Sequence, residues 1–192
     1  MRRLLLIGLF LGVLLSGLGE SCGKAWAGPN DDLLSAAFNG DIALVKASLR
    51  AGADVNAKTN TGITALMEAV WMGKANMIRL LLKGGADVNA KADNGTTALM
   101  QAAGMGKANK IRLLLKGGAD VNARDANDGT TALMQAVMNR ETNVIRLLLK
   151  GGADVNAKAN TGLTARDYAT GENKDEVISL LDNWTASHST GN

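Results

Sequence analysis

Four aspartates recur at nearly constant spacing along the chain, at Asp54, Asp87, Asp120 and Asp154. The steps between them are 33, 33 and 34 residues. A ladder of carboxylates would suit Ca²⁺, which takes several oxygen ligands at once. In space, however, a step of this length separates successive aspartate side chains by one helix diameter, about 10 Å. That distance is too long for two neighbouring aspartates to share an ion. We therefore interpret each aspartate as a turn residue that acts with the nearby asparagine.

No other group of residues has the spacing of a catalytic or metal site. His188 is the only histidine and Cys22 the only cysteine. Beyond residue 27 the sequence contains no Gly-x-Ser-x-Gly, no Gly-rich phosphate loop and no His/Cys metal spacing. We expect neither enzymatic activity nor a cofactor.

Basic residues form a second periodic set, paired at i and i+4 within three similar segments: Arg79/Lys83, Arg112/Lys116 and Arg146/Lys150. A stripe of this kind would attract an anionic lipid or polymer. We favour a solvated helix face, because cations are also stabilising near the C-terminal end of a helix.

The elements that position these residues repeat with the same period. The heptapeptide Gly-Ala-Asp-Val-Asn-Ala-Lys/Arg starts at Gly52, Gly85, Gly118 and Gly152. A fixed period of this length is typical of a solenoid, in which each small unit buries its apolar faces against its neighbours. Aligned on the heptapeptide, the units span residues 31–58, 59–91, 92–124, 125–158 and 159–182.

Each full unit has the same internal order: a polar turn, a short helix and a second, Leu-rich helix. Thr64 stands where a helix N-cap is needed, and Leu66, Ala69 and Val70 follow at helical spacing. The second helix carries Ile-Arg-Leu-Leu-Leu-Lys at 78–83 and ends at the glycine pair 84–85, which is typical of a left-handed C-terminal cap.

The order turn–Gly–x–Thr–x–Leu–x–x–Ala, a Leu-rich helix and Gly-Ala-Asp-Val-Asn resembles the ankyrin repeat, over residues 31 to about 182. The resemblance implies an all-α repeat solenoid of stacked helix-turn-helix units with β-hairpin finger loops. The family's Thr-Pro-Leu-His reads Thr-Ala-Leu-Met here, as at 64–67. Arg140 replaces the glycine of positions 73 and 106, which implies a residue in the left-handed region.

The last two units depart from the repeat. The fourth has an extra residue within 125–129, so we expect its finger to be one residue longer. The fifth breaks the pattern at Arg166-Asp167-Tyr168. Residues 183–192 are rich in Ser, Thr and Gly, which predicts a flexible C-terminal tail.

Variation among the units indicates where function lies. The second and third units differ at nine aligned positions, and by the family's geometry six of these fall on the concave face. That face would carry a broken apolar band, flanking hydrogen-bonding groups and polar finger tips. An adaptable peptide or protein site has this composition, whereas packing between helices is the alternative. The candidate partner-binding residues are Phe38, Asn60, Glu68, Trp71, Met72, Asp93, Gln101, Met105, Asn127, Gln135 and Met138.

The first 27 residues have the pattern of a secretory signal peptide: Arg2 and Arg3, the apolar run 4–15 and the small-residue site 25–27. An uncleaved anchor and a lipoprotein modified at Cys22 are the alternatives. The formal charge of the whole chain is +3; without the leader, 18 of the 21 basic and 17 of the 18 acidic side chains remain, a net +1. This balance argues against nucleic-acid binding. No later apolar run is long enough to span a membrane.

The sequence therefore predicts an exported, bacterial-type ankyrin repeat domain at 28–182 that acts in the periplasm or outside the cell. We expect a monomer that binds a protein or peptide in its concave groove. The alternative is a membrane-associated scaffold that is retained through its N-terminal segment.

Overall fold

The computed structural model describes residues 28–188; residues 1–27, where the expected signal peptide falls, and 189–192 lie outside the described part. Helices in the described part come in pairs. The first helices of the units are α1 (Pro29–Asn39), α3 (Ala65–Trp71), α5 (Ala98–Gly104) and α7 (Ala132–Met138). The second helices are α2 (Ile42–Arg50), α4 (Ala75–Lys83), α6 (Ala108–Lys116) and α8 (Thr142–Lys150), and α9 (Lys174–His188) closes the stack.

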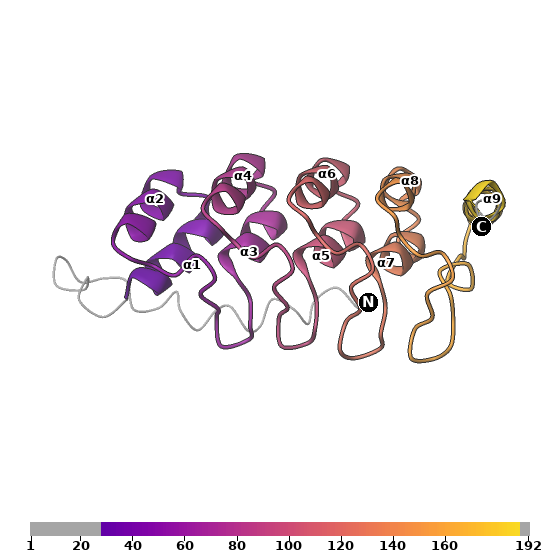
Figure 1. Cartoon of the computed structure of the whole chain (residues 1–192), viewed down its shortest axis with the longest axis horizontal. Helices are drawn as coiled ribbons and strands as arrows, with labels where there is room; N and C mark the ends of the chain where they lie inside the picture. The colour runs from indigo at the N-terminus through magenta and orange to yellow at the C-terminus, as the bar shows by residue number, and fades with distance from the viewer. Residues whose placement is uncertain (1–27, 189–192) are drawn as a thin grey trace.

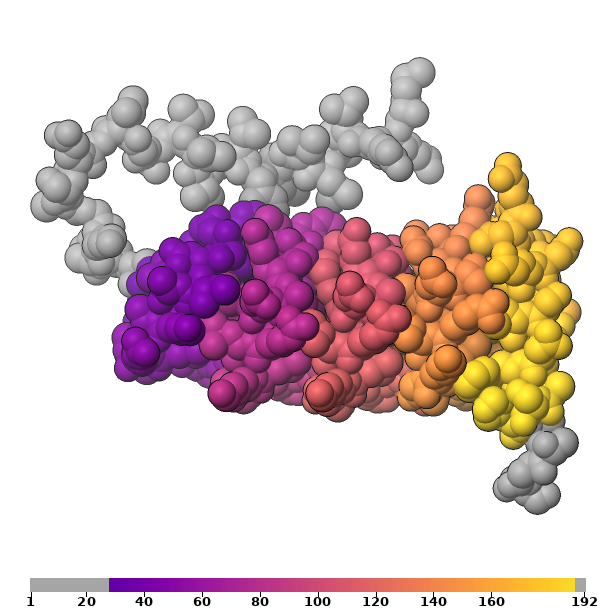
Figure 2. Space-filling model, turned by 90° about the horizontal axis from the view of Figure 1, so that it is seen from above, coloured from indigo at the N-terminus to yellow at the C-terminus, as the bar shows by residue number. Residues whose placement is uncertain are grey.

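The pairs stack side by side into two layers, with the first helices in one layer and the second helices in the other (Figure 1). Loops project away from the helix layers between successive units. Seen from above, the units follow one another along the long axis in the order of the sequence (Figure 2). This is the all-α repeat solenoid that the sequence predicts.

Local sequence explains where each helix begins and ends. Thr64 accepts a hydrogen bond from the backbone N–H of Met67 at 3.4 Å, and the equivalent threonines of α5 and α7 do the same. At the end of α4, Gly85 has φ 89°. The N–H of Ala86 donates to the carbonyl of Leu81 at 3.0 Å. These contacts form the left-handed cap that the glycine pair predicts.

The core is continuous from unit to unit. Its largest fully buried side chains include equivalent leucines of the first helices and equivalent isoleucines of the second: Leu66, Leu99, Leu133, Ile78, Ile111 and Ile145. Because no single helix pair can enclose these side chains, stacking supplies most of the stability.

The finger loops are held by single antiparallel bridges rather than by long strands: Lys58–Thr64, Lys91–Thr97 and Lys158–Thr164. The fourth unit is organised differently, around Asp125. Its Oδ1 accepts from the N–H groups of Asn127, Asp128 and Gly129 at 3.0–3.1 Å. The additional residue is accommodated within this turn.

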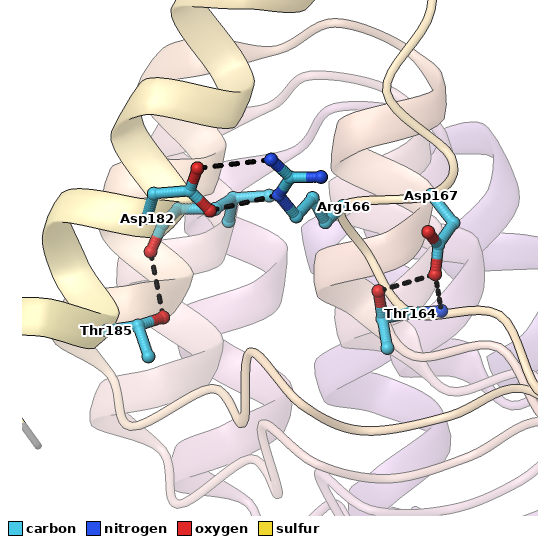
Figure 3. A network of polar contacts seen from close by, with 6 residues as sticks. Thr164, Arg166, Asp167, Asp182 and Thr185 are labelled. Atoms are coloured by element: carbon cyan, nitrogen blue, oxygen red, sulfur yellow. Dashed lines mark hydrogen bonds and ion pairs between the residues drawn. The ribbon is translucent and has the colours of Figure 1, made fainter.

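Arg140 has φ 60°, which confirms the left-handed conformation implied by its glycine counterparts. The stack ends differently from a regular unit, since 165–168 form a turn rather than a first helix. There the carboxylate of Asp167 accepts from the N–H and hydroxyl of Thr164, at 2.8 and 2.7 Å (Figure 3). An ion pair of 3.0 Å between Arg166 and Asp182 joins this turn to α9.

Helix α9 corrects the expected boundary of the tail. It continues through His188, so residues 183–188 are helical rather than a flexible tail. Trp184 is half-buried against the core and its ring stacks on that of His188, with centroids 4.0 Å apart. The Thr185 hydroxyl donates to the carbonyl of Leu181 at 2.9 Å. Packing of one aromatic side chain therefore outweighs a composition that favours loops.

Candidate functional site

The periodic aspartates are turn residues, as the sequence predicts. Asp87 Oδ1 accepts from the N–H of Asn89 at 2.9 Å, and the other three aspartates make the same bond at the same distance. Within the described residues, no group of three His, Cys, Asp or Glu side chains has the arrangement of a metal site.

The asparagines of the same motif connect neighbouring units, which the sequence did not reveal. Asn89 Oδ1 accepts from the N–H of Asp120 at 2.7 Å, and its Nδ2 donates to the carbonyl of Gly118 at 3.2 Å. Asn122 makes the equivalent pair with the next unit. At the N-terminal end, Asn30 supplies the acceptor for the N–H of Asp54 at 2.8 Å. The repeated motif is therefore a connector along the stack.

The apolar candidates lie at the ends of the first helices. Trp71 is 55% exposed, and Phe38, Met72 and Met138 are each close to 38–39% exposed. Met105 follows α5 and is half-buried. Because α1, α3, α5 and α7 lie side by side, these residues follow one another along the stack: Phe38, Trp71 and Met138 at one equivalent position, and Met72 and Met105 at the next.

A gap interrupts this row at α5, where the equivalent residue is Gly104. A Cβ atom added to Gly104 would lie 3.3 Å from Oε1 of Gln135. The side chain of Gln135 in α7 therefore reaches back across the end of α5. Aromatic side chains fill the same position in the two preceding units.

The polar candidates divide into two groups. Asn60, Asp93 and Asn127 are exposed on the fingers, away from the helix ends. Glu68, Gln101 and Gln135 lie in the middle of α3, α5 and α7 and are half-buried. Burial raises the pKa of Glu68 above its ordinary value of 4.5. The Oε1 atom of Gln101 is buried without a hydrogen-bond partner.

Lys110 is a buried cation that sequence reasoning missed. Its ammonium donates to the carbonyl of Val70 in the preceding unit at 2.7 Å, beneath Gly73. Burial, followed by the nearby charge of Lys107, lowers the pKa of Lys110. The signal in the sequence is that the equivalent residues of the two neighbouring units, Met77 and Val144, are apolar.

The basic pairs of the second helices, by contrast, are exposed to solvent. None of the helices in the described part is long and apolar enough to cross a membrane. The first helices present exposed apolar side chains next to half-buried hydrogen-bonding groups.

Such a stack of helix pairs with projecting fingers defines a repeat protein of the solenoid class. The family model described as ankyrin repeats (3 copies) matches residues 33–125 and 124–190. The chain therefore belongs to the ankyrin repeat family, whose members generally mediate protein–protein interaction and are typically not enzymes. A search of curated proteins finds no match.

Proposed function

We propose that this protein binds a protein or peptide partner on the face formed by the first helices and the fingers. The observation that carries the proposal is the exposure of Trp71 and Met72 at the end of α3 and of Met138 at the end of α7. Large, exposed apolar side chains at the centre of a surface supply most of the free energy of association in protein interfaces. Methionine adds adaptability, because its unbranched side chain adjusts to different partners.

The finger tips are proposed to provide specificity around this apolar row. Asn60, Asp93 and Asn127 are exposed at equivalent positions of three fingers. The residue is Asp in the third unit, and the finger of the fourth unit is one residue longer. Polar groups at the rim of an interface fix orientation more than they add affinity. We propose a monomer as the binding species.

Trp71→Ala tests the site. We expect the free energy of unfolding to change by only about 0.5 kcal/mol, since substitutions of exposed residues are usually of this size. Capture of the partner from an envelope extract should decrease strongly. Leu44→Ala is the matched control, because Leu44 is 38% exposed but lies on the second helix α2, outside the first helices and the fingers. A large loss of stability in Trp71→Ala would identify Trp71 as a core residue instead and would contradict the proposal.

We also propose that the protein is exported and acts in the periplasm or outside the cell. The support is the N-terminal sequence: two arginines, the apolar run 4–15 and the small-residue site 25–27. The second candidate, a scaffold retained at the membrane, rests on the same apolar run. Fractionation with N-terminal sequencing distinguishes them. A mature chain that begins at Gly28 in a fraction free of membranes supports export, and an intact leader in the membrane fraction supports retention.

A further inference from the structure

Glu68 is an acidic group without a counter-charge. It lies half-buried on α3, and no hydrogen bond or ion pair to its carboxylate occurs within residues 28–188. Burial alone accounts for the direction of its pKa shift, and no cation offsets it. Removing a carboxylate from water is costly unless a positive charge or hydrogen-bond donors compensate. The carboxylate of Glu68 therefore has no ion-pair partner within residues 28–188.

The lysines of two finger stems donate their hydrogen bonds elsewhere. The ammonium of Lys58 donates to the carbonyl of Lys91 at 2.9 Å, and that of Lys91 donates to the carbonyl of Arg124 at 3.2 Å. Each is bound to the backbone of the following unit. The chain thus directs its own basic side chains along the stack and leaves Glu68 unpaired.

A second unsatisfied acceptor stands on the neighbouring helix. Gln101 occupies on α5 the position that Glu68 occupies on α3, and the two helices pack side by side. Its buried Oε1 has no donor. Gln135 reaches back to Gly104 at the end of α5, and Gln101 occupies the equivalent position one unit earlier. A buried acceptor without a donor is unfavourable, so a ligand that supplies a donor is favoured.

Trp71 completes the arrangement. It lies three residues after Glu68 on α3, a spacing that places two side chains on the same face of a helix. More than half of its surface is exposed. The face of an indole ring carries negative electrostatic potential and attracts ammonium and guanidinium groups. Together, Glu68, Trp71 and Gln101 form what we call the acceptor cradle.

We propose that the acceptor cradle binds an arginine or lysine side chain of the partner polypeptide. A carboxylate, an amide oxygen and an indole face all favour the same chemistry, namely a positively charged hydrogen-bond donor. An acidic side chain would meet repulsion there, and a neutral apolar side chain would leave both oxygens unsatisfied. The inference rests on the proposed function and adds the charge of the residue that the surface selects.

The test uses residues 28–192 labelled with ¹⁵N and three short peptides that differ in one residue: acetyl-Ala-Arg-Ala-amide and its Gln and Glu counterparts. The indole N–H signal of Trp71 reports binding, and that of Trp184 on α9 serves as an internal reference. We expect saturable shifts at Trp71 with the Arg peptide alone, weakened by added salt. No saturable shift with the Arg peptide, or equal shifts with the Glu peptide, would overturn the inference.

Glu68→Gln should weaken binding of the Arg peptide about three- to tenfold, which is the range expected for loss of a partly screened ion pair. The matched control is Glu141→Gln, since Glu141 is also half-buried but lies at the start of α8. An unchanged affinity in Glu68→Gln would contradict the cradle. If the captured partner needs Trp71 but is indifferent to Glu68→Gln, the proposed function stands and this inference falls. If neither substitution affects the captured partner, the proposed function itself fails.

Discussion

At the scale of single residues, the positions proposed for binding are those where the chain departs from the best packing or pairing. Glu68 is a half-buried acid without a partner, Gln101 has an unsatisfied oxygen and Trp71 is largely exposed. At each position, a different residue would make the folded protein more stable. Surfaces that recognise a partner commonly carry this kind of local cost.

Glu68→Gln is predicted to stabilise the free protein. The pKa of Glu68 is raised in the folded chain, so the stabilising contribution of its protonated form is present below about pH 4.5 and is lost as the pH rises through the folded pKa. At pH 7 the ionised carboxylate is unfavourable, and Gln should add about 0.5 kcal/mol, a modest value because the carboxyl retains contact with solvent. Urea unfolding at pH 7 and pH 4 measures this, and the gain should shrink at pH 4. Lower stability of the variant at pH 7 would contradict it.

Lys110 shows what sequence reasoning at this scale cannot resolve. A lysine at an apolar position predicts only a disruption of the helix face. The structure instead places its ammonium on a carbonyl 40 residues earlier in the chain, at the C-terminal end of α3. A cation is favoured there by the helix dipole. Such a contact depends on the distance between two stacked units, and the sequence pattern within one unit does not predict that distance.

At the scale of elements, the finger of the fourth unit is the part of the stack most dependent on one charge. Its turn is built around Asp125, which also accepts from the Thr130 hydroxyl at 2.9 Å. The finger of the third unit uses a neutral acceptor instead, since the N–H of Thr96 donates to Asn94 Oδ1. The sequence predicts the longer finger from its extra residue, but not that one carboxylate would organise it.

We therefore predict that this finger loosens in acid before the finger of the third unit. Partial burial would raise the pKa of Asp125, but hydrogen bonds from the N–H of Asp128, the Thr130 hydroxyl and the N–H of Gly129 lower it below 3.8. A depressed pKa contributes stability that is present above the unfolded value and is lost as the pH falls through the folded pKa. Protection of the amides at 127–129 against hydrogen exchange should decrease below about pH 3.8. The turn at 94–96 is the control, and a parallel loss of protection there would contradict the prediction.

At the C-terminal end, the sequence predicts the first part of helix α9 but not its extension. The apolar positions Val177 and Leu181 predict a helix, and both are buried as expected. The next residues are Ser, Thr and Asn-rich, and their composition favours a loop. Trp184 extends the helix because its ring packs against the core and against His188. That gain is a tertiary contact, which local propensity does not include.

At the scale of the whole molecule, the fold was predictable because each unit repeats the same sequence signals. Caps, apolar faces and glycine stops occur at the same offsets in successive units, so independent signals agree. The period does not predict the hydrogen bonds that connect one unit to the next. The asparagine bonds span 31 or 32 residues and join the turn of one unit to the backbone of the next. These bonds run along one edge of the stack, where they oppose bending between units.

Asn89→Ala tests this coupling against Asn156→Ala. Both asparagines belong to the same motif and donate their N–H to the preceding aspartate at 2.9 Å. The side chain of Asn89 also bonds to the next unit through both of its polar atoms, whereas that of Asn156 makes no hydrogen bond within residues 28–188. We expect Asn89→Ala to lower the free energy of unfolding in urea by about 1 kcal/mol and Asn156→Ala to have almost no effect. Because repeats are coupled mainly through neighbour contacts, Asn89→Ala should also broaden the transition. Equal effects of the two substitutions would show that the asparagine acts within its own turn and not between units.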